Sequence, residues 1–280
     1  MARNIRGPGR TASAACGLFG LKCRGADHFA GTRRKRKSQS CFVNKPALPQ
    51  RAVPPALRAM NVAIIGAGNV GSALGRSWAK AGHSIIYGVR NPGGGKTQPP
   101  TFSGVSSRLI PDAARVGDVV VLATPWNAIP DVVGALGDMK GKTIIDCTNP
   151  LTLSPEGSLG LEIGSTSSGA EEIQKLLPTA HVVKAFNTYG WENFENSTYP
   201  GYGDLKPVMF LCSDDDDAKE MVAKLATDLG FEPIDTGGLG MARSLEPLAL
   251  LWIRLAIREG RNPNFVWGVM RRAATAPAAG

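Results

Sequence analysis

The sequence predicts a doubly wound, mainly parallel α/β sheet in a single domain. From residue 60 onward, short apolar runs alternate with segments of helical periodicity, as in sheets covered by helices on both faces. A glycine-rich turn joins the first apolar run to the first helical segment. Only about 40 residues follow the last predicted strand, too few for a separate helical substrate domain. Substrate is therefore expected to bind at the carboxyl edge of the sheet itself.

The first strand, turn and helix carry the clearest functional signal. Apolar residues 62–65 lead into six consecutive residues, Gly66, Ala67, Gly68, Asn69, Val70 and Gly71. A helix is predicted from Asn69 to Ala81, followed by a second strand over residues 85–87. In such a Rossmann-type unit the first glycine permits the tight turn, the second admits a pyrophosphate, and the third allows close helix packing. We therefore predict that residues 66–71 bind the pyrophosphate of a dinucleotide at a helix N-terminus.

The end of the second strand indicates which dinucleotide binds. NAD sites place an Asp or Glu there to bind the ribose 2′-hydroxyl, whereas this chain has Gly88 followed by Arg90 and Asn91. A guanidinium can bind a 2′-phosphate that a carboxylate would repel, so we predict NADP(H). Lys96, in the following loop, is a second candidate contact. Alternatively, Arg90 is only a solvated loop residue.

The positive charge belongs to the N-terminal segment. Residues 1–59 contain 13 Lys and Arg but one acidic residue, whereas residues 60–280 contain 19 Lys and Arg against 22 Asp and Glu. The globular part therefore gives no electrostatic reason to bind nucleic acid. The five cysteines show no CxxC spacing or Cys/His cluster, so neither a metal site nor a disulfide framework is predicted. No apolar run is long enough to predict a membrane span.

Residues 1–59 are interpreted as a basic, disordered leader. Their composition suits an organelle transit peptide of a chloroplast or mitochondrion, and Arg33 to Lys37 could alternatively act as a nuclear address. A third interpretation is a mis-assigned start, because Met60 stands directly before the first strand; the protein would then be cytoplasmic. We predict the NADP-binding domain over residues 60–270, including a C-terminal helix, and a disordered tail over residues 271–280.

Further strands and helices alternate along the rest of the domain. The strands are predicted over residues 118–124, 142–147, 181–186, 207–212 and 231–235. The helices are predicted over residues 129–136, 170–177, 214–229 and 242–258. Residues 151–168 are expected to form a long functional loop.

Five motifs resemble the NADPH-dependent coenzyme F420 reductases and the related cytosolic oxidoreductase domain of the six-transmembrane metalloreductases. They are GAGNVGSALGRSWAKAGHSIIYGVRNP, VVLATPW, DCTNP, VVKAFNT and TGGLGMARSLEPLALLW, within residues 60–272. The resemblance implies hydride transfer between NADPH and a deazaflavin (coenzyme F420), or a flavin in the metalloreductase branch. It also implies a homodimer. The AFNT sequence, where archaeal deazaflavin reductases place a His at position 187, is closer to the metalloreductase branch and to bacterial relatives.

The resemblance also assigns roles to residues of this chain. Residues 66–71 are implied to bind the pyrophosphate. Arg90 and Asn91 are implied to bind the 2′-phosphate. The ribose and nicotinamide are implied to lie beside Thr124, Pro125, Trp126, Asn149 and Ala185. Asn187 and Thr188 are implied to orient the carboxamide or an acceptor carbonyl, because hydride transfer needs placement and exclusion of water rather than a nucleophile or metal.

Each of these residues also has a structural interpretation. Trp126 could simply begin a helix, and Asn187 with Thr188 could cap a loop. His83 and His181 are interpreted as structural, and residues 214–217 as helix-capping carboxylates. Arg243 and Glu246 are expected at the surface or at a dimer contact.

The sequence therefore predicts an NADP(H)-dependent oxidoreductase that passes a hydride to a deazaflavin-type small-molecule acceptor. A flavin or ferric-chelate reductase is the alternative within the same class. A non-catalytic NADP(H)-binding regulator is the alternative of another class.

Overall fold

The computed structural model describes residues 59–92 and 99–272. The predicted leader up to residue 58, Lys96, and the predicted tail from residue 273 lie outside the described residues. Among the described residues, no helix has both the length and the apolar character needed to cross a bilayer.

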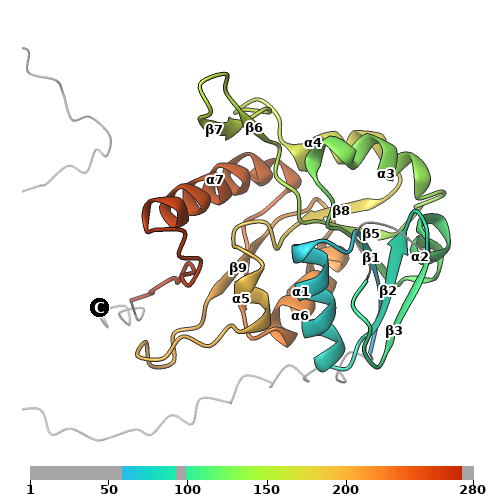
Figure 1. Ribbon diagram of the computed structural model, residues 1–280, viewed down its shortest axis with the longest axis horizontal. Helices are drawn as coiled ribbons and strands as arrows, with labels where there is room; N and C mark the ends of the chain where they lie inside the picture. The colour runs from blue at the N-terminus through green and yellow to red at the C-terminus, as the bar shows by residue number, and fades with distance from the viewer. Residues whose placement is uncertain (1–58, 93–98, 273–280) are drawn as a thin grey trace, which may run out of the picture. The chain divides into compact units, whose positions relative to one another are not determined.

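The central element is a six-stranded sheet whose neighbouring strands all pair in parallel (Figure 1). Its strand order is β3-β2-β1-β4-β5-β8. The chain moves outward from β1 to β3 on one side of the sheet and from β4 to β8 on the other, so the strand order reverses between β1 and β4. The fold prediction is confirmed, and the reversal between β1 and β4 marks the crevice in which doubly wound sheets bind ligands. The strands are β1 (Asn61–Ile65), β2 (Ser84–Val89), β3 (Val105–Leu109), β4 (Val119–Leu122), β5 (Thr143–Asp146) and β8 (His181–Lys184).

Alternate residues of the strands enter two separate cores. In β1, Val62 and Ile64 join the core that also holds Trp78, whereas Ala63 and Ile65 join the core on the other face. This is the period of two expected of a strand buried on both sides. The continuous apolar runs of the sequence thus indicate a sheet that is covered on both faces.

The helices that cover the sheet follow the strands in sequence. They are α1 (Asn69–Lys80), α2 (Ile110–Val116), η1 (Trp126–Ala128), α3 (Ile129–Ala135), α4 (Gly169–Leu176), α5 (Glu192–Glu195), α6 (Asp216–Asp228), η2 (Leu239–Met241) and α7 (Ala242–Arg258). The core beside α1 contains residues of α6, and the opposite core contains residues of α2, α3 and α4. The 17-residue α7 lies beside the hairpin formed by β6 and β7 (Figure 1), and Arg254 donates a hydrogen bond to the Leu159 carbonyl there.

Three features differ from the sequence prediction. The edge strand β3 and the helix α2 were not predicted, because four of the five β3 residues are exposed and give no apolar alternation. The predicted loop over residues 151–168 contains the short antiparallel hairpin of β6 (Leu151–Leu153) and β7 (Leu159–Leu161). Finally, β9 (Val208–Leu211) and β10 (Glu232–Asp235) form a separate parallel pair. A single antiparallel bridge joins Cys212, just after β9, to Lys184 of the main sheet.

Candidate cofactor and active site

The turn between β1 and α1 is closed by glycines. Gly66 has a φ of +109°, and a Cβ there would lie 2.6 Å from the Ala123 carbonyl oxygen. A Cβ on Gly71 would lie 2.0 Å from the Gly66 carbonyl oxygen. Both contacts are with backbone that cannot move aside, so the turn accepts only glycine at these positions. Ala67, between them, is buried.

The N-terminus of α1 is left without a side-chain cap. Gly68 is the N-cap residue and therefore supplies no capping side chain, and the first turn of the helix contains no acidic residue. Nothing lies within 4 Å of the position that a Gly68 Cβ would occupy. Asn69 and Gly68 are exposed, and Val70 is half-buried. An uncapped 12-residue helix behind an open glycine turn presents its dipole and free N–H groups to an anion, as a bound pyrophosphate requires.

The end of β2 places a cation near this turn. Gly88 carries no acidic side chain of the kind that an NAD site uses, and a Cβ there would lie 2.4 Å from Ile65 Cδ1, so a larger residue would require Ile65 to move. Arg90, two residues later, is exposed, and no hydrogen bond or ion pair joins its guanidinium to another described residue. Asn91 is also exposed. The arrangement fits the predicted 2′-phosphate contact.

The end of β4 contributes a buried hydroxyl and an indole. Thr124 Oγ1 is buried without a hydrogen-bond partner among the described residues. Pro125 is exposed, and Trp126 begins the short helix η1, as its structural interpretation proposed. The half-buried Trp126 ring also packs against Gly169 at the start of α4, and its Nε1 donates to Glu162 Oε2 over 3.1 Å. Trp126 therefore lines the edge beyond β4 and joins it to the segment that follows the β6–β7 hairpin.

The ends of β5 and β8 are joined by two asparagines. Asn149 Nδ2 donates to the Asn187 carbonyl, and Asn187 Nδ2 donates to Asn149 Oδ1, both over 3.0 Å. Asn187 Nδ2 also donates to the Leu245 carbonyl of α7. Asn187 Oδ1, in contrast, is buried and has no partner in the described part of the chain. An amide held by its nitrogen with its oxygen left free is prepared to accept one hydrogen bond.

An unusual backbone conformation directs this asparagine. Phe186 has a φ of 57°, which a residue with a side chain rarely adopts. Its ring is buried, and the ring centroid lies 5.3 Å from that of Trp78 and 6.0 Å from that of Phe194. This aromatic packing holds the left-handed turn. Ala185 is fully buried before it, and Thr188 is buried after it.

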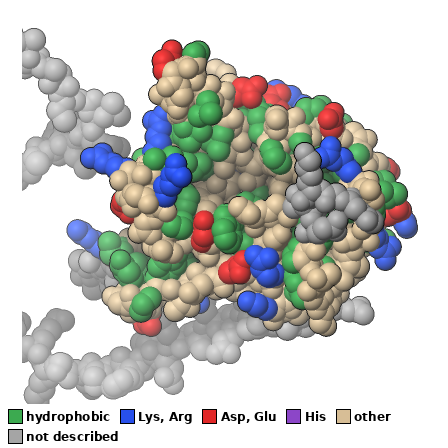
Figure 2. All heavy atoms as spheres, viewed as in Figure 1, with side chains coloured by type: hydrophobic (Ala, Val, Ile, Leu, Met, Phe, Trp, Pro, Cys, Tyr) green, Lys and Arg blue, Asp and Glu red, His purple; other side chains and the backbone are tan. Residues whose placement is uncertain are grey.

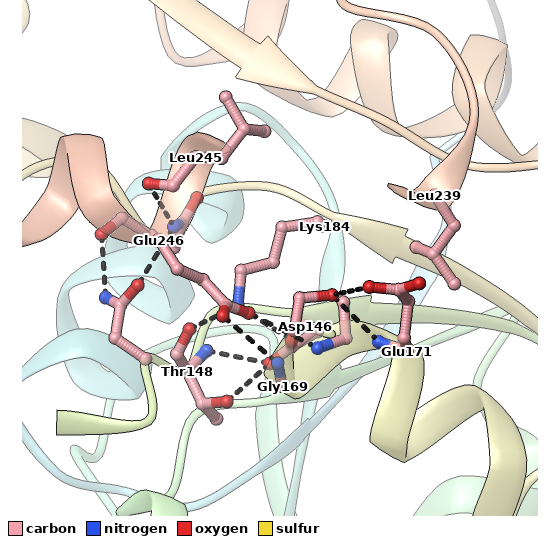
Figure 3. Close-up of polar contacts among 12 residues, drawn as sticks. Asp146, Thr148, Gly169, Glu171, Lys184, Leu239, Leu245 and Glu246 are labelled. Carbon is pink, nitrogen blue, oxygen red and sulfur yellow. Dashed lines mark hydrogen bonds and ion pairs between the residues drawn. The ribbon is translucent and has the colours of Figure 1, made fainter. Parts of the chain in front are cut away.

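Beneath the asparagines lies a buried ion cluster that the sequence analysis did not find (Figure 3). Lys184 Nζ lies 2.8 Å from Asp146 Oδ2 and 2.9 Å from Glu246 Oε1, and all three side chains are at most 1% exposed. Burial lowers the pKa of Lys184, but the two carboxylates outweigh burial and leave that pKa above its usual value. The prediction that Glu246 lies at the surface is wrong, because its side chain is buried between Lys184 of β8 and the first N–H groups of α4. Arg243 is half-exposed and pairs with Glu171.

The structural interpretations of the other polar residues hold. His83 accepts a hydrogen bond from the Met60 backbone N–H and contacts Asp228, while His181 pairs with Asp215. Asp215 caps α6 by accepting from the Ala218 N–H.

The hollow at the carboxyl edge lies between α7 and α1, with hydrophobic side chains around it (Figure 2). A separate cavity of about 140 Å³ lies between the loop before β9 and the C-terminal segment, and no predicted cofactor residue lines it.

Comparison with known proteins identifies the family. Residues 61–150 match the model of the family described as NADP oxidoreductase, coenzyme F420-dependent. A solved structure from Arthrobacter sp. FB24, described as a candidate F420-dependent NADP reductase, is 31% identical in sequence with a TM-score of 0.68. The alignment covers 76% of this chain and all of that one. The chain belongs to the coenzyme F420-dependent NADP oxidoreductase family. It is thus an NADP-dependent oxidoreductase, and the resemblance inferred from the motifs is confirmed.

Curated members of this wider group include metalloreductases. The chain is similar to metalloreductase STEAP3 of Rattus norvegicus, with 28% identity over 197 residues, which is 69% of this chain and 37% of STEAP3. Human metalloreductase STEAP2 is 27% identical over 196 residues, which is 69% of this chain and 36% of STEAP2. The chain therefore spans little more than a third of the length of these curated relatives.

Proposed function

We propose that this oxidoreductase binds NADPH along the carboxyl edge of its sheet and passes a hydride to a flavin-like ring, either a deazaflavin or a flavin. The observation that carries the proposal is the unpartnered Asn187 Oδ1. It lies at the end of β8, across the strand-order reversal from the glycine turn at the end of β1. In a doubly wound sheet a dinucleotide lies across that reversal.

The adenosine half of the edge, defined as β1, α1 and the end of β2, supplies the phosphate contacts of this proposal. The uncapped N–H groups of α1 bind the pyrophosphate, and Gly68 lets it approach the backbone. Arg90 binds the 2′-phosphate through its guanidinium fork. Asn91 is the second candidate contact to that phosphate.

The nicotinamide half, defined as the ends of β4, β5 and β8 together with α7, positions the reactive ring. Asn187 Oδ1 accepts a hydrogen bond from the carboxamide, and Asn149 holds the Asn187 side chain in place. Thr124 Oγ1, buried and unpartnered, is a second hydrogen-bonding group for the ribose or the ring. Hydride transfer breaks the C4–H bond, moves both electrons to the acceptor and leaves a cationic nicotinamide ring, while the acceptor takes one further proton from solvent. The chain's own task is therefore placement and exclusion of water.

Two acceptor classes are supported by different relatives. The family description and the Arthrobacter protein favour coenzyme F420. The STEAP relatives, described as metalloreductases, favour a flavin or a ferric chelate, and the asparagine at position 187 agrees with that branch as the motif resemblance describes it. Trp126, at the edge of the crevice, is the aromatic surface against which either ring would pack.

The test is an anaerobic assay of NADPH oxidation with coenzyme F420, FMN and a ferric chelate as separate acceptors. The proposal expects turnover with at least one of the two ring acceptors. Asn187→Ala is expected to lower the rate of hydride transfer by about tenfold or more, because one orienting hydrogen bond is lost. Asn196→Ala is the matched control, since Asn196 is exposed and bonds only its own loop among the described residues. Turnover with the ferric chelate alone would contradict transfer to a flavin-like ring.

A further inference from the structure

The ion cluster beneath the nicotinamide half contains one more negative than positive charge. Lys184 Nζ is surrounded by three acceptors, which are Asp146 Oδ2, Glu246 Oε1 and the Thr148 carbonyl. These three acceptors match the three N–H donors of a protonated ammonium group. The raised pKa of Lys184 agrees with this protonation state.

Each carboxylate of the cluster accepts several hydrogen bonds from the described residues around it. Asp146 accepts from Lys184 Nζ and from both the N–H and the hydroxyl of Thr148, the latter two over 2.8 and 2.7 Å. Glu246 accepts from Lys184 Nζ and from the N–H groups of Gly169 and Ala170, the latter two over 3.1 and 3.3 Å. Figure 3 shows these donors converging on the two carboxylates. The backbone N–H groups and the Lys184 ammonium can only donate, so both carboxylates act as acceptors towards them.

The positive end of α4 offsets only part of this charge. The first N–H groups of α4 point at Glu246, and a helix N-terminus corresponds to roughly half of a positive charge. The neighbouring Arg243–Glu171 pair adds one charge of each sign at the surface between α4 and α7. A net negative charge therefore remains in the interior, where solvent screens it little.

The position of the cluster brings this charge close to the reactive end of the crevice. Asp146 precedes Thr148 and Asn149 at the end of β5, and Lys184 precedes Asn187 at the end of β8. Glu246 follows Leu245, whose carbonyl holds the Asn187 amide. The cluster thus lies directly behind the residues that the proposed function assigns to the nicotinamide.

We propose that the Asp146–Lys184–Glu246 cluster shifts the bound cofactor towards its oxidised form. The ring of NADP⁺ is cationic and that of NADPH is neutral, so a fixed negative charge behind the ring stabilises only NADP⁺. Binding NADP⁺ more tightly than NADPH lowers the reduction potential of the bound cofactor and favours hydride donation to the acceptor. This inference rests on the proposed location of the nicotinamide, but not on the identity of the acceptor.

The test measures the dissociation constants of NADP⁺ and NADPH separately, without any acceptor. Glu246→Gln and Asp146→Asn each remove one negative charge while preserving side-chain size. Each variant is expected to raise the dissociation constant of NADP⁺, relative to that of NADPH, by a factor on the order of ten. This is the size of effect that removing a unit charge gives at an effective dielectric constant of about 20. Glu171→Gln is the matched control, because it removes a carboxylate between the same two helices at a more exposed site, and the ratio should stay unchanged.

A purely structural role predicts a different result. If the cluster only docks α7, both dissociation constants rise together and their ratio stays constant, which overturns the inference. The wild-type protein gives a test that does not depend on folding of the variants. The two wild-type constants should place the potential of the bound cofactor below that of free NADP(H), and an equal or higher potential also overturns the inference. Failure of the wild type to bind either nucleotide would instead defeat the proposed function.

Discussion

The adenosine half and the nicotinamide half of the sheet edge are constructed differently. The adenosine half consists of glycines, free backbone N–H groups and Arg90, all within residues 61–90. The nicotinamide half consists of polar side chains brought together over long separations, such as the 77 positions between Gly169 and Glu246. The first depends mainly on exposed backbone and on one cationic side chain, whereas the second depends on specific pairs of side chains. The comparison explains why a short motif identifies one half but not the other.

The two halves also differ in what they leave unsatisfied. On the adenosine half, the unsatisfied groups carry partial or full positive charge, as at the uncapped start of α1 and at the exposed Arg90. On the nicotinamide half they are buried and neutral, as at Thr124 Oγ1 and Asn187 Oδ1. Exposed charges supply affinity for phosphate, whereas buried neutral groups impose orientation because leaving them unpaired is unfavourable.

The largest effect is expected from a single methyl group on the adenosine half. Gly71→Ala would place a Cβ 2.0 Å from the Gly66 carbonyl oxygen, so α1 must move away from β1. We expect the free energy of unfolding to fall by about 2–3 kcal/mol. NADPH binding should weaken by about a hundredfold or more, equivalent to about 2.7 kcal/mol. Chemical denaturation and fluorescence titration measure the two effects.

Gly68→Ala separates the loss of stability from the loss of NADPH binding, which Gly71→Ala is expected to cause together. Nothing lies within 4 Å of the Gly68 Cβ position, so the stability should change by less than about 0.5 kcal/mol. NADPH binding should still weaken, since the new methyl group occupies the space through which the pyrophosphate approaches. Unchanged affinity in Gly68→Ala would show that the phosphate does not lie over this residue.

The different construction of the two halves sets how much the sequence could reveal. The glycine turn was predictable because its function follows from the local backbone, and the apolar runs of β1, β4 and β5 marked buried strands. The same local logic predicted a helix from about Ala242 to Arg258, and α7 has these ends in the structure. Gly75 was not given a role, although a Cβ there would lie 2.0 Å from the Tyr87 hydroxyl oxygen. Its importance depends on a contact between α1 and β2, which spacing alone does not show.

The nicotinamide half was predictable only through family motifs. Asn149 and Asn187 were named from these motifs, but their mutual hydrogen bonds depend on the adjacency of β5 and β8. Glu246 looked like a surface residue because it is charged and lies on an amphipathic helix. Its burial follows from Lys184, which was read simply as part of an apolar strand. A lysine within such a run is the signal that could have indicated a buried partner of opposite charge.

An intermediate effect is expected from removing the cation of the adenosine half. Arg90→Ala should weaken NADPH binding by about 10- to 100-fold, as expected for the loss of a charge-assisted phosphate contact worth about 1.5–3 kcal/mol. NADH lacks the 2′-phosphate, so its binding should change by less than about twofold. Titration of both nucleotides against wild type and variant measures this selectivity.

The control for Arg90→Ala is Arg115→Ala on α2, a helix that packs against β1 and β2. Arg115 is also exposed, but its carbonyl accepts a hydrogen bond from Lys142, which precedes β5. Arg115 therefore lies at the amino edge, away from the predicted cofactor, and the variant should bind both nucleotides normally. Equal losses of NADPH and NADH affinity in Arg90→Ala would contradict the 2′-phosphate assignment.

A pH-dependent effect concerns the exclusion of water beside the nicotinamide half. Cys212 forms the backbone bridge to Lys184, and burial raises the pKa of its thiol from 9.0 to about 12. The folded protein therefore keeps a proton that the unfolded chain releases above about pH 9. The resulting stability is fully present below that pH and is lost as the pH rises towards about 12. Its slope is at most about 1.4 kcal/mol per pH unit.

Urea unfolding of wild type and Cys212→Ala at several pH values between about 8 and 11 isolates this contribution. Cys147, Tyr87 and Tyr189 also have raised pKa values, so both proteins should lose stability as the pH rises. The wild type should lose it more steeply, because only the wild type carries the Cys212 thiol. Parallel slopes would mean that water reaches the thiol in the folded state. Water at the junction between β8 and β9 would then screen the charge of the neighbouring ion cluster. The cluster would in that case shift the reduction potential of the bound cofactor by less.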